Sequence, residues 1–132
     1  MIVADASWIV ALRDPLDPHH GEAAAINEVL SDERALLHPV TFAECLVAPA
    51  LLGMLDDAAA ALRAAFEVID IDLDAPLRWA SLRAETGLRL PDVIVLDTAL
   101  HHGATSIATF DEKLAARAFD RQLEILGAPP TT

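Results

Sequence analysis

Short apolar runs alternate with amphipathic segments along the whole chain. A continuous apolar run bounded by polar or turn residues predicts a buried strand, and apolar residues three or four positions apart predict one face of a helix. Strands are expected at residues 2–4, 35–38, 67–71, 106–109 and 123–126. Helices are expected at residues 7–13, 18–30, 39–52, 55–66, 76–87, 92–102 and 111–118.

This alternation is typical of βαβ units, in which helices cover both faces of a parallel sheet. We therefore expect an α/β fold, a three-layer α/β/α sandwich with a central parallel sheet of four or five strands. A chain of 132 residues is long enough for one domain with a real core. The domain is expected to span residues 1–126, and residues 127–132 are expected to form a flexible C-terminal tail.

The composition is that of a globular chain, with 54% hydrophobic and 23% charged residues. The net charge of −12 argues against the broad basic surface of a nucleic-acid-binding protein. The single cysteine, Cys45, excludes an internal disulfide and fits a reducing compartment. We expect neither a cleavable signal peptide nor a membrane span, and hence a cytoplasmic protein with no membrane partner.

Four acidic residues stand where folding alone does not require them: Asp5, Glu44, Asp92 and Asp111. Asp5 and Asp111 follow predicted strands, so both should emerge at the carboxyl edge of the sheet, where sites of such folds lie. Glu44 has mostly apolar neighbours on its helix, and Asp92 opens another apolar helix. Crowded carboxylates repel one another unless a cation joins them, so the four acids predict a pocket for divalent metal ions.

Each of these acids also has a purely structural interpretation. Asp5 and Asp111 are good N-caps for the helices that follow them, and Asp92 would complement a helix dipole. Glu44 would need no partner if its helix face were simply exposed. A fifth acid, Asp97, lies on the same predicted helix as Asp92, about 140° around its axis, so both cannot easily face one ion. We treat Asp97 as a structural residue or as a support for the metal ligands.

Four segments, in this order along nearly the whole chain, resemble those of PIN domains, and most closely those of the VapC-type toxins of bacterial type II toxin–antitoxin pairs. They are residues 2–7 (IVADAS), 40–49 (VTFAECLVAP), 90–100 (LPDVIVLDTAL) and 103–111 (GATSIATFD). Two details depart from the family. The start common in the family, Asp-Thr-Ser, is Asp5-Ala6-Ser7 here, and Asp97 stands where many members carry a small residue.

The resemblance implies a ribonuclease that depends on Mg²⁺ or Mn²⁺. Its catalytic and metal-binding residues would be Asp5, Glu44, Asp92 and Asp111. Ser7 and Thr109 match positions where the family often supplies a hydroxyl to the same site. The basic candidates to hold an RNA substrate are Arg83, Arg89, Lys113 and Arg117.

The resemblance also implies two protein partners. A cognate VapB-type antitoxin would dock over the early helices, with an arginine directed into the acidic pocket. A homodimer is usual in the family, and the helices predicted at 39–52 and 55–66 could supply its interface.

Two other functions fit parts of the pattern. A PIN fold without nuclease activity could serve as a protein-binding module, although all four acids are present. A receiver-type phosphoacceptor domain would need paired acids after the first strand and a lysine after a late strand. Asp5 stands alone, and the only lysine, Lys113, lies in a predicted helix, which argues against this class.

Overall fold

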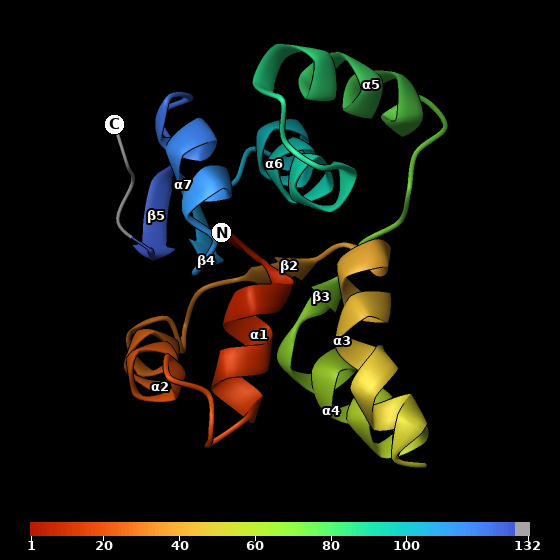
Figure 1. The fold of residues 1–132 in the computed structure, drawn as a ribbon, viewed down its shortest axis with the longest axis vertical. Helices are drawn as coiled ribbons and strands as arrows, with labels where there is room; N and C mark the ends of the chain where they lie inside the picture. Colours follow the sequence, from red (N-terminus) through yellow and green to blue (C-terminus); the bar gives the residue numbers. More distant parts are fainter. Residues whose placement is uncertain (129–132) are drawn as a thin grey trace.

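A five-stranded parallel sheet forms the middle layer of the protein (Figure 1). The computed structural model describes residues 1–128. The strand order is β3-β2-β1-β4-β5, and every neighbouring pair is parallel. The strands are β1 (Ile2–Ala4), β2 (Ala35–Leu37), β3 (Glu67–Val68), β4 (Ser106–Thr109) and β5 (Glu124–Gly127).

Helices cover both faces of this sheet (Figure 1). None of those within residues 1–128 is long and apolar enough to cross a membrane. One face carries α1 (Ala6–Arg13), α2 (His20–Val29), α3 (Pro39–Leu51) and α4 (Leu55–Ala65). The other face carries α6 (Leu90–His102) and α7 (Glu112–Phe119), with α5 (Ala75–Thr86) packed on α6. The expected three-layer α/β/α sandwich is confirmed.

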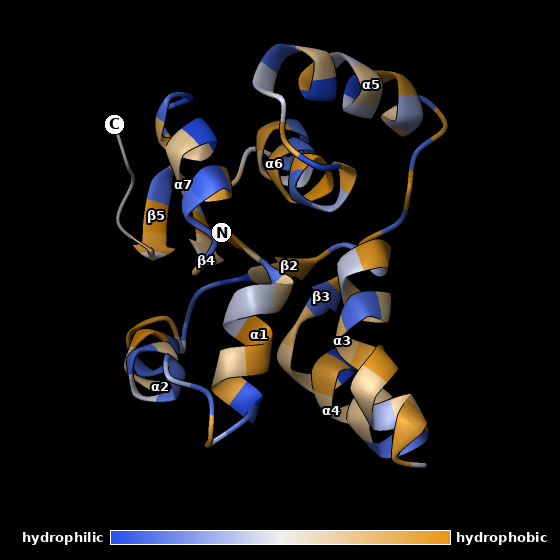
Figure 2. Cartoon of the chain, in the orientation of Figure 1, coloured by the Kyte–Doolittle hydropathy of each residue, from blue (hydrophilic) through white to orange (hydrophobic). Residues whose placement is uncertain are grey.

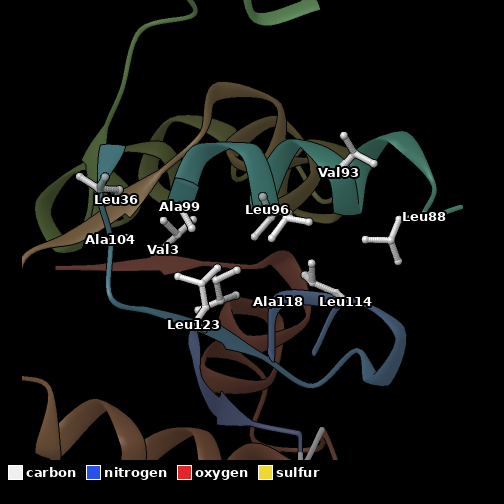
Figure 3. Close-up of a cluster of buried hydrophobic side chains, with 12 residues drawn as sticks. Val3, Leu36, Leu88, Val93, Leu96, Ala99, Ala104, Leu114, Ala118 and Leu123 are labelled. Carbon is white, nitrogen blue, oxygen red and sulfur yellow. The ribbon is translucent and has the colours of Figure 1, made fainter. Parts of the chain in front are cut away.

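Alternation along the strands gives each face its own hydrophobic core. Because successive strand residues point to opposite faces, Val3 and Ile107 lie in the core under α6 and α7, where Leu96 and Leu114 are fully buried (Figure 3). The other core lies under α1 to α4 and is built from Ile2, Ala4, Trp8, Ile9, Leu37, Phe42, Leu62 and Ala108. Both faces are dry, which explains why the strand sequences are continuously apolar.

Strand register places the candidate acids at one edge. In β1, Ile2 aligns with Ala35 on one side and with Ser106 on the other. The amide of Asp5, directly after β1, donates to the carbonyl of Ala108 in β4. The chain therefore leaves β1 and β4 at the same carboxyl edge, with Asp5 and Asp111 beside each other in the sheet order.

Two predicted elements are shorter in the structure. Helix α2 begins at His20 and not at Pro18, because the Asp17 carboxylate accepts from the His19 amide and the Asp17 carbonyl from the His20 amide, which makes a turn. Strand β3 ends at Val68 and not at residue 71. It is an edge strand beside β2, which ends at Leu37, and the bond from the Ile69 amide to the Leu37 carbonyl, at 3.1 Å, is made just beyond it.

The last strand runs into the segment predicted as a tail. Gly127 belongs to β5 and has a φ of +124°, a conformation that side chains rarely allow. A Cβ there would collide with the carbonyl oxygen of Thr109. The Ala128 amide then donates to that same oxygen at 2.7 Å. Gly127 and Ala128 are thus tied to the sheet, and residues 129–132 of the expected tail lie outside the described residues.

Candidate active site

Two hydroxyl groups hold the carboxylate of Asp5 at the end of β1. Ser7 Oγ donates to Asp5 Oδ2 at 2.6 Å, and Thr109 Oγ1 donates to the same oxygen at 2.8 Å. The backbone carbonyl of Asp5 starts helix α1, but its side chain makes no capping bond. The interpretation of the Asp5 carboxylate as a helix cap is therefore wrong, and the carboxylate is oriented from the neighbouring strand.

The same two hydroxyls tie β1 to the segment after β4. Thr109 Oγ1 accepts from the amide of Asp111 at 2.9 Å, and Ser7 Oγ accepts from the amide of Phe110 at 3.0 Å. Each hydroxyl thus donates to Asp5 and accepts from a backbone amide on the adjacent segment. Hydroxyls that are used in both directions have little rotational freedom, so the backbone before Asp111 and the carboxylate of Asp5 are fixed relative to each other.

Asp111 begins helix α7 and caps it. Its Oδ1 accepts from the amide of Leu114 at 2.9 Å, as an N-cap does. The structural interpretation of Asp111 is thus confirmed. A carboxylate has two oxygens and about four acceptor sites, so this cap leaves the group able to bind a cation as well.

Asp92 lies in the first turn of α6 and is almost fully buried, with 7% of its surface exposed. Burial, followed by the negative charges of Asp111 and Asp5, raises the pKa of Asp92 to about 6. Arg89 opposes the shift, with its Nε 3.6 Å from Asp92 Oδ2. Asp92 is thus a carboxylate in an environment of other carboxylates, only weakly compensated by an arginine.

Glu44 joins this group from helix α3. Glu44 is exposed to solvent, so the alternative that its helix face is simply exposed is correct at this position. The pKa of the Glu44 carboxylate is nevertheless raised. Partial burial is the largest cause, the charges of Asp5 and Asp92 act in the same direction, and Arg89 opposes them. Glu44 therefore lies within electrostatic range of Asp5 and Asp92, and Asp92 within range of Asp5 and Asp111, although the four acids come from separate elements.

A cleft of about 460 Å³ opens beside two of the acids and is lined in part by basic side chains. Arg89 and Lys113 line it together with Asp92, Asp111 and Glu112. The other two basic candidates do not line the cleft: Arg83 donates to the carbonyl of Leu88 at its wall, and Arg117 pairs with Asp120 at 3.3 Å.

Asp97, the fifth acid, belongs to a different network. Arg78 donates to it from Nε at 2.9 Å and from Nη2 at 3.2 Å, and Trp79 Nε1 donates at 3.1 Å. Arg78 also donates twice to Asp72, which joins α5 to the loop before it. Asp97 is therefore a structural residue that fixes α5 on α6. The sequence shows no local sign of this pairing, since Arg78 and Asp97 are separated by most of two helices.

The donor set at the acidic edge suits a hard cation, because it consists of carboxylate and hydroxyl oxygens. In the part of the chain that the structure describes, no three His, Cys, Asp or Glu side chains are close enough to hold one ion together. Mg²⁺ needs no such cage, since it usually keeps several waters and takes one or two carboxylates. The residues present therefore fit a hydrated Mg²⁺ or Mn²⁺ better than a fully protein-bound ion.

Comparison with solved structures finds proteins of the same fold, among them a toxin and a toxin–antitoxin complex. A toxin–antitoxin complex from Klebsiella pneumoniae aligns with a TM-score of 0.72 and 25% identity, over 88% of this chain and 91% of that one. VapC20 of Mycobacterium tuberculosis, described as a toxin that cleaves the sarcin–ricin loop, aligns with a TM-score of 0.70 and 19% identity, over 89% and 95%. FitAcB from Neisseria gonorrhoeae aligns with a TM-score of 0.71 and 20% identity, over 96% of both chains.

A search of curated protein sequences gives no significant match. The model of the PIN domain family, however, matches residues 2–120. Of the elements within the described residues, this range contains four of the five strands and all seven helices, and it contains the four acids of the site. The expected resemblance is thus confirmed, and the chain belongs to the PIN domain family.

Proposed function

We propose that this chain is a metal-dependent endoribonuclease and the toxin of a type II toxin–antitoxin pair, with Asp5, Glu44, Asp92 and Asp111 as its catalytic acids. One observation carries the proposal. At the carboxyl edge of the sheet, burial and the charges of Asp111 and Asp5 raise the pKa of Asp92. Burial and the charges of Asp5 and Asp92 raise the pKa of Glu44, and Arg89 opposes both shifts. Such an arrangement costs stability unless a cation joins it. The structural relatives, two of them described as toxins or toxin–antitoxin complexes, support the same function.

Asp5, Glu44, Asp92 and Asp111 are the residues that would hold Mg²⁺ or Mn²⁺. When bound, such an ion supplies a water of lowered pKa and a positive charge opposite the phosphate. Cleavage by water would leave 5′-phosphate and 3′-hydroxyl ends, with no need for the RNA 2′-hydroxyl as nucleophile.

The remaining residues of the site would orient the acids and the RNA. Ser7 and Thr109 fix the Asp5 carboxylate, so that its free oxygen points in one direction. Arg89 and Lys113 line the cleft beside Asp92 and are placed to bind phosphates of the strand. With a net charge of −12, the protein must rely on these few cations and on the bound metal, because its wider surface repels a polyanion.

The same charge distribution supports a basic antitoxin as the partner, since an acidic edge attracts a cationic peptide.

For the homodimer, the end of the α3–α4 hairpin is the surface that we propose. Several large apolar side chains are exposed there, and Figure 2 shows hydrophobic positions at this end of the molecule, with hydrophilic ones among them. They are Val47, Leu51, Leu52, Met54 and Leu55. Apolar surface of this kind marks interaction sites.

The test is cleavage of total cellular RNA by purified, antitoxin-free protein in Mg²⁺ or Mn²⁺. We expect discrete fragments that disappear with EDTA and with Asp5→Asn, which keeps an oxygen for Ser7 and Thr109 to bind. Asp120→Asn, an exposed change at the end of α7, is the matched control and should cut normally. If folded, metal-loaded protein cuts no RNA, the enzyme proposal is wrong and the PIN fold serves as a binding module.

A further inference from the structure

Two rings from distant parts of the sequence are stacked next to the acidic edge. The imidazole of His19 lies on the ring of Phe110, with 4.4 Å between centroids and 11° between planes. His19 is the residue before α2, and Phe110 is the first residue after β4. Phe110 directly precedes Asp111, so the stacked pair adjoins the proposed catalytic acids. Neither the fold nor the four acids explain why an aromatic stack should stand at this place.

The inner ring of the pair is firmly held. The Phe110 amide donates to Ser7 Oγ, which in turn donates to Asp5. The ring is half-buried and packs against the core under α1 and α2. On another side it reaches β5, where a Cβ on Gly127 would stand 3.2 Å from Phe110 Cε1. A glycine at 127 therefore leaves room for this ring, and the position of Phe110 is fixed by both strand and helix.

His19, which carries the outer ring, is held through its backbone. The His19 amide donates to the carboxylate of Asp17 at 2.8 Å, which fixes the turn. Its side chain remains 53% exposed, and Oε2 of Glu22 lies 4.0 Å from its Nδ1. The imidazole is thus a planar group, supported from below by Phe110 and open to solvent.

We propose that His19 and Phe110 form a stacking platform for an unpaired base of the RNA substrate, next to the phosphate held at the acids. Proteins recognise single-stranded RNA largely by stacking its bases on aromatic side chains, including histidine. This inference rests on the proposed ribonuclease function and adds how the base is bound. Stacking is also the contact that an acidic protein can offer to RNA without adding to charge repulsion, because it does not use the phosphates.

The binding test needs no cleavage. In the Asp5→Asn background with Mg²⁺, one probe is an oligoadenylate hexamer with a central 2-aminopurine, whose fluorescence falls on stacking. The other is an abasic hexamer with the same phosphates. His19→Ala and Phe110→Leu should each weaken binding of the base-containing hexamer about ten-fold, which is about 1.4 kcal/mol, and abolish the quenching. Binding of the abasic hexamer should not change. His102→Ala, an exposed histidine at the end of α6, is the matched control and should leave both unchanged.

Equal losses for both hexamers, or no loss for either, would overturn the platform. The proposal would also be overturned if His19→Ala and Phe110→Leu bound RNA normally and lost affinity for a basic antitoxin peptide instead. His19→Ala removes an exposed side chain, so it remains informative if Phe110→Leu fails to fold. In the cleaving protein, His19→Ala should raise KM and leave kcat nearly unchanged. If the wild-type protein cuts no RNA, the proposed function fails, whereas cleavage with unaltered KM in His19→Ala removes the platform alone.

Discussion

Helix α6 carries two acids that are equally buried and have opposite surroundings. Asp92 is 7% exposed and Asp97 is 5% exposed. Asp97 receives three hydrogen bonds, two from Arg78 and one from Trp79. Asp92 faces the charges of Asp111 and Asp5, and its nearest cation, Arg89, is 3.6 Å away. Burial of an acid therefore does not distinguish a structural role from a functional one; its partners do.

The pKa shifts in the two networks differ because the partners of the acids differ. In the structural network, hydrogen bonds from Arg78 hold the pKa of Asp72 below its usual range, and Asp72 and Asp97 raise the pKa of Arg78. Each charge there stabilises another. At the acidic edge, burial and neighbouring acids raise the pKa of Asp92 to about 6. Such an unfavourable arrangement is typical of sites where the charge is needed for binding or chemistry.

The largest effect should separate these two acids by activity. Asp92→Asn is expected to lower the rate of RNA cleavage at least about 100-fold, because it removes a proposed metal ligand without creating a cavity. Asp97→Asn should leave kcat within about two-fold and lower the thermal midpoint instead, since it weakens a charge-assisted bond to Arg78. Cleavage kinetics and thermal melts of both variants provide the measurement. Equal loss of activity in the two variants would contradict the division between the acids.

Next in size is the stability of the structural network. Arg78→Met should destabilise the protein by about 2 kcal/mol, because it leaves the buried Asp97 charge without its arginine. We place the effect below that of a fully buried pair, since Arg78 is 29% exposed. Denaturant unfolding measures it. Adding Asp97→Leu to Arg78→Met removes the unpaired charge and should restore part of the lost free energy of unfolding. If the double variant is instead less stable than Arg78→Met by the full effect of Asp97→Leu alone, Arg78 does not stabilise the Asp97 charge.

A smaller effect is expected from the hydroxyl between Asp5 and Asp111. Thr109→Val keeps the side-chain volume but removes the donor to Asp5 and the acceptor for the Asp111 amide. We expect metal affinity and cleavage to fall about ten-fold, as for other groups that orient ligands. Thr98→Val is the matched control, because the buried Thr98 hydroxyl bonds only to Ile94 in its own helix. Titration with Mn²⁺ should show a weaker site in the first variant only.

The smallest effect concerns pH. The pKa of Asp92 is higher in the folded protein, at about 6, than its ordinary value of 3.8. The folded state therefore binds the proton more tightly, and stability falls as pH rises from about 4 to about 6. In metal-free protein, wild type should lose stability across this window, whereas Asp92→Asn should not. Thermal melts at a series of pH values test this. Added Mg²⁺ at pH 7 should restore the loss in wild type, and parallel curves for the two proteins would contradict the assigned pKa.

Most of the fold could be predicted because its signals are local. Apolar runs such as Ile2–Ala4 and Ser106–Thr109 mark strands that are buried on both faces. Gly87 and Gly103, both with positive φ, end helices α5 and α6 where the pattern expected. Two of the misplaced boundaries depend on distant contacts. Strand β3 stops because its neighbour β2 stops, and Gly127 remains in the sheet because it fits against Thr109.

The candidate site was only partly predictable, for the same reason. The order of strand ends and acids along the chain determined that Asp5 and Asp111 would share the carboxyl edge, because parallel strands bring their ends together. The resemblance to PIN domains added Ser7 and Thr109. Only the tertiary structure decided that Asp97 pairs with Arg78, that Arg89 and Lys113 face the cleft, and that His19 stacks on Phe110. Periodicity specifies which face of an element is buried, but the partner of a polar side chain depends on how separate elements pack.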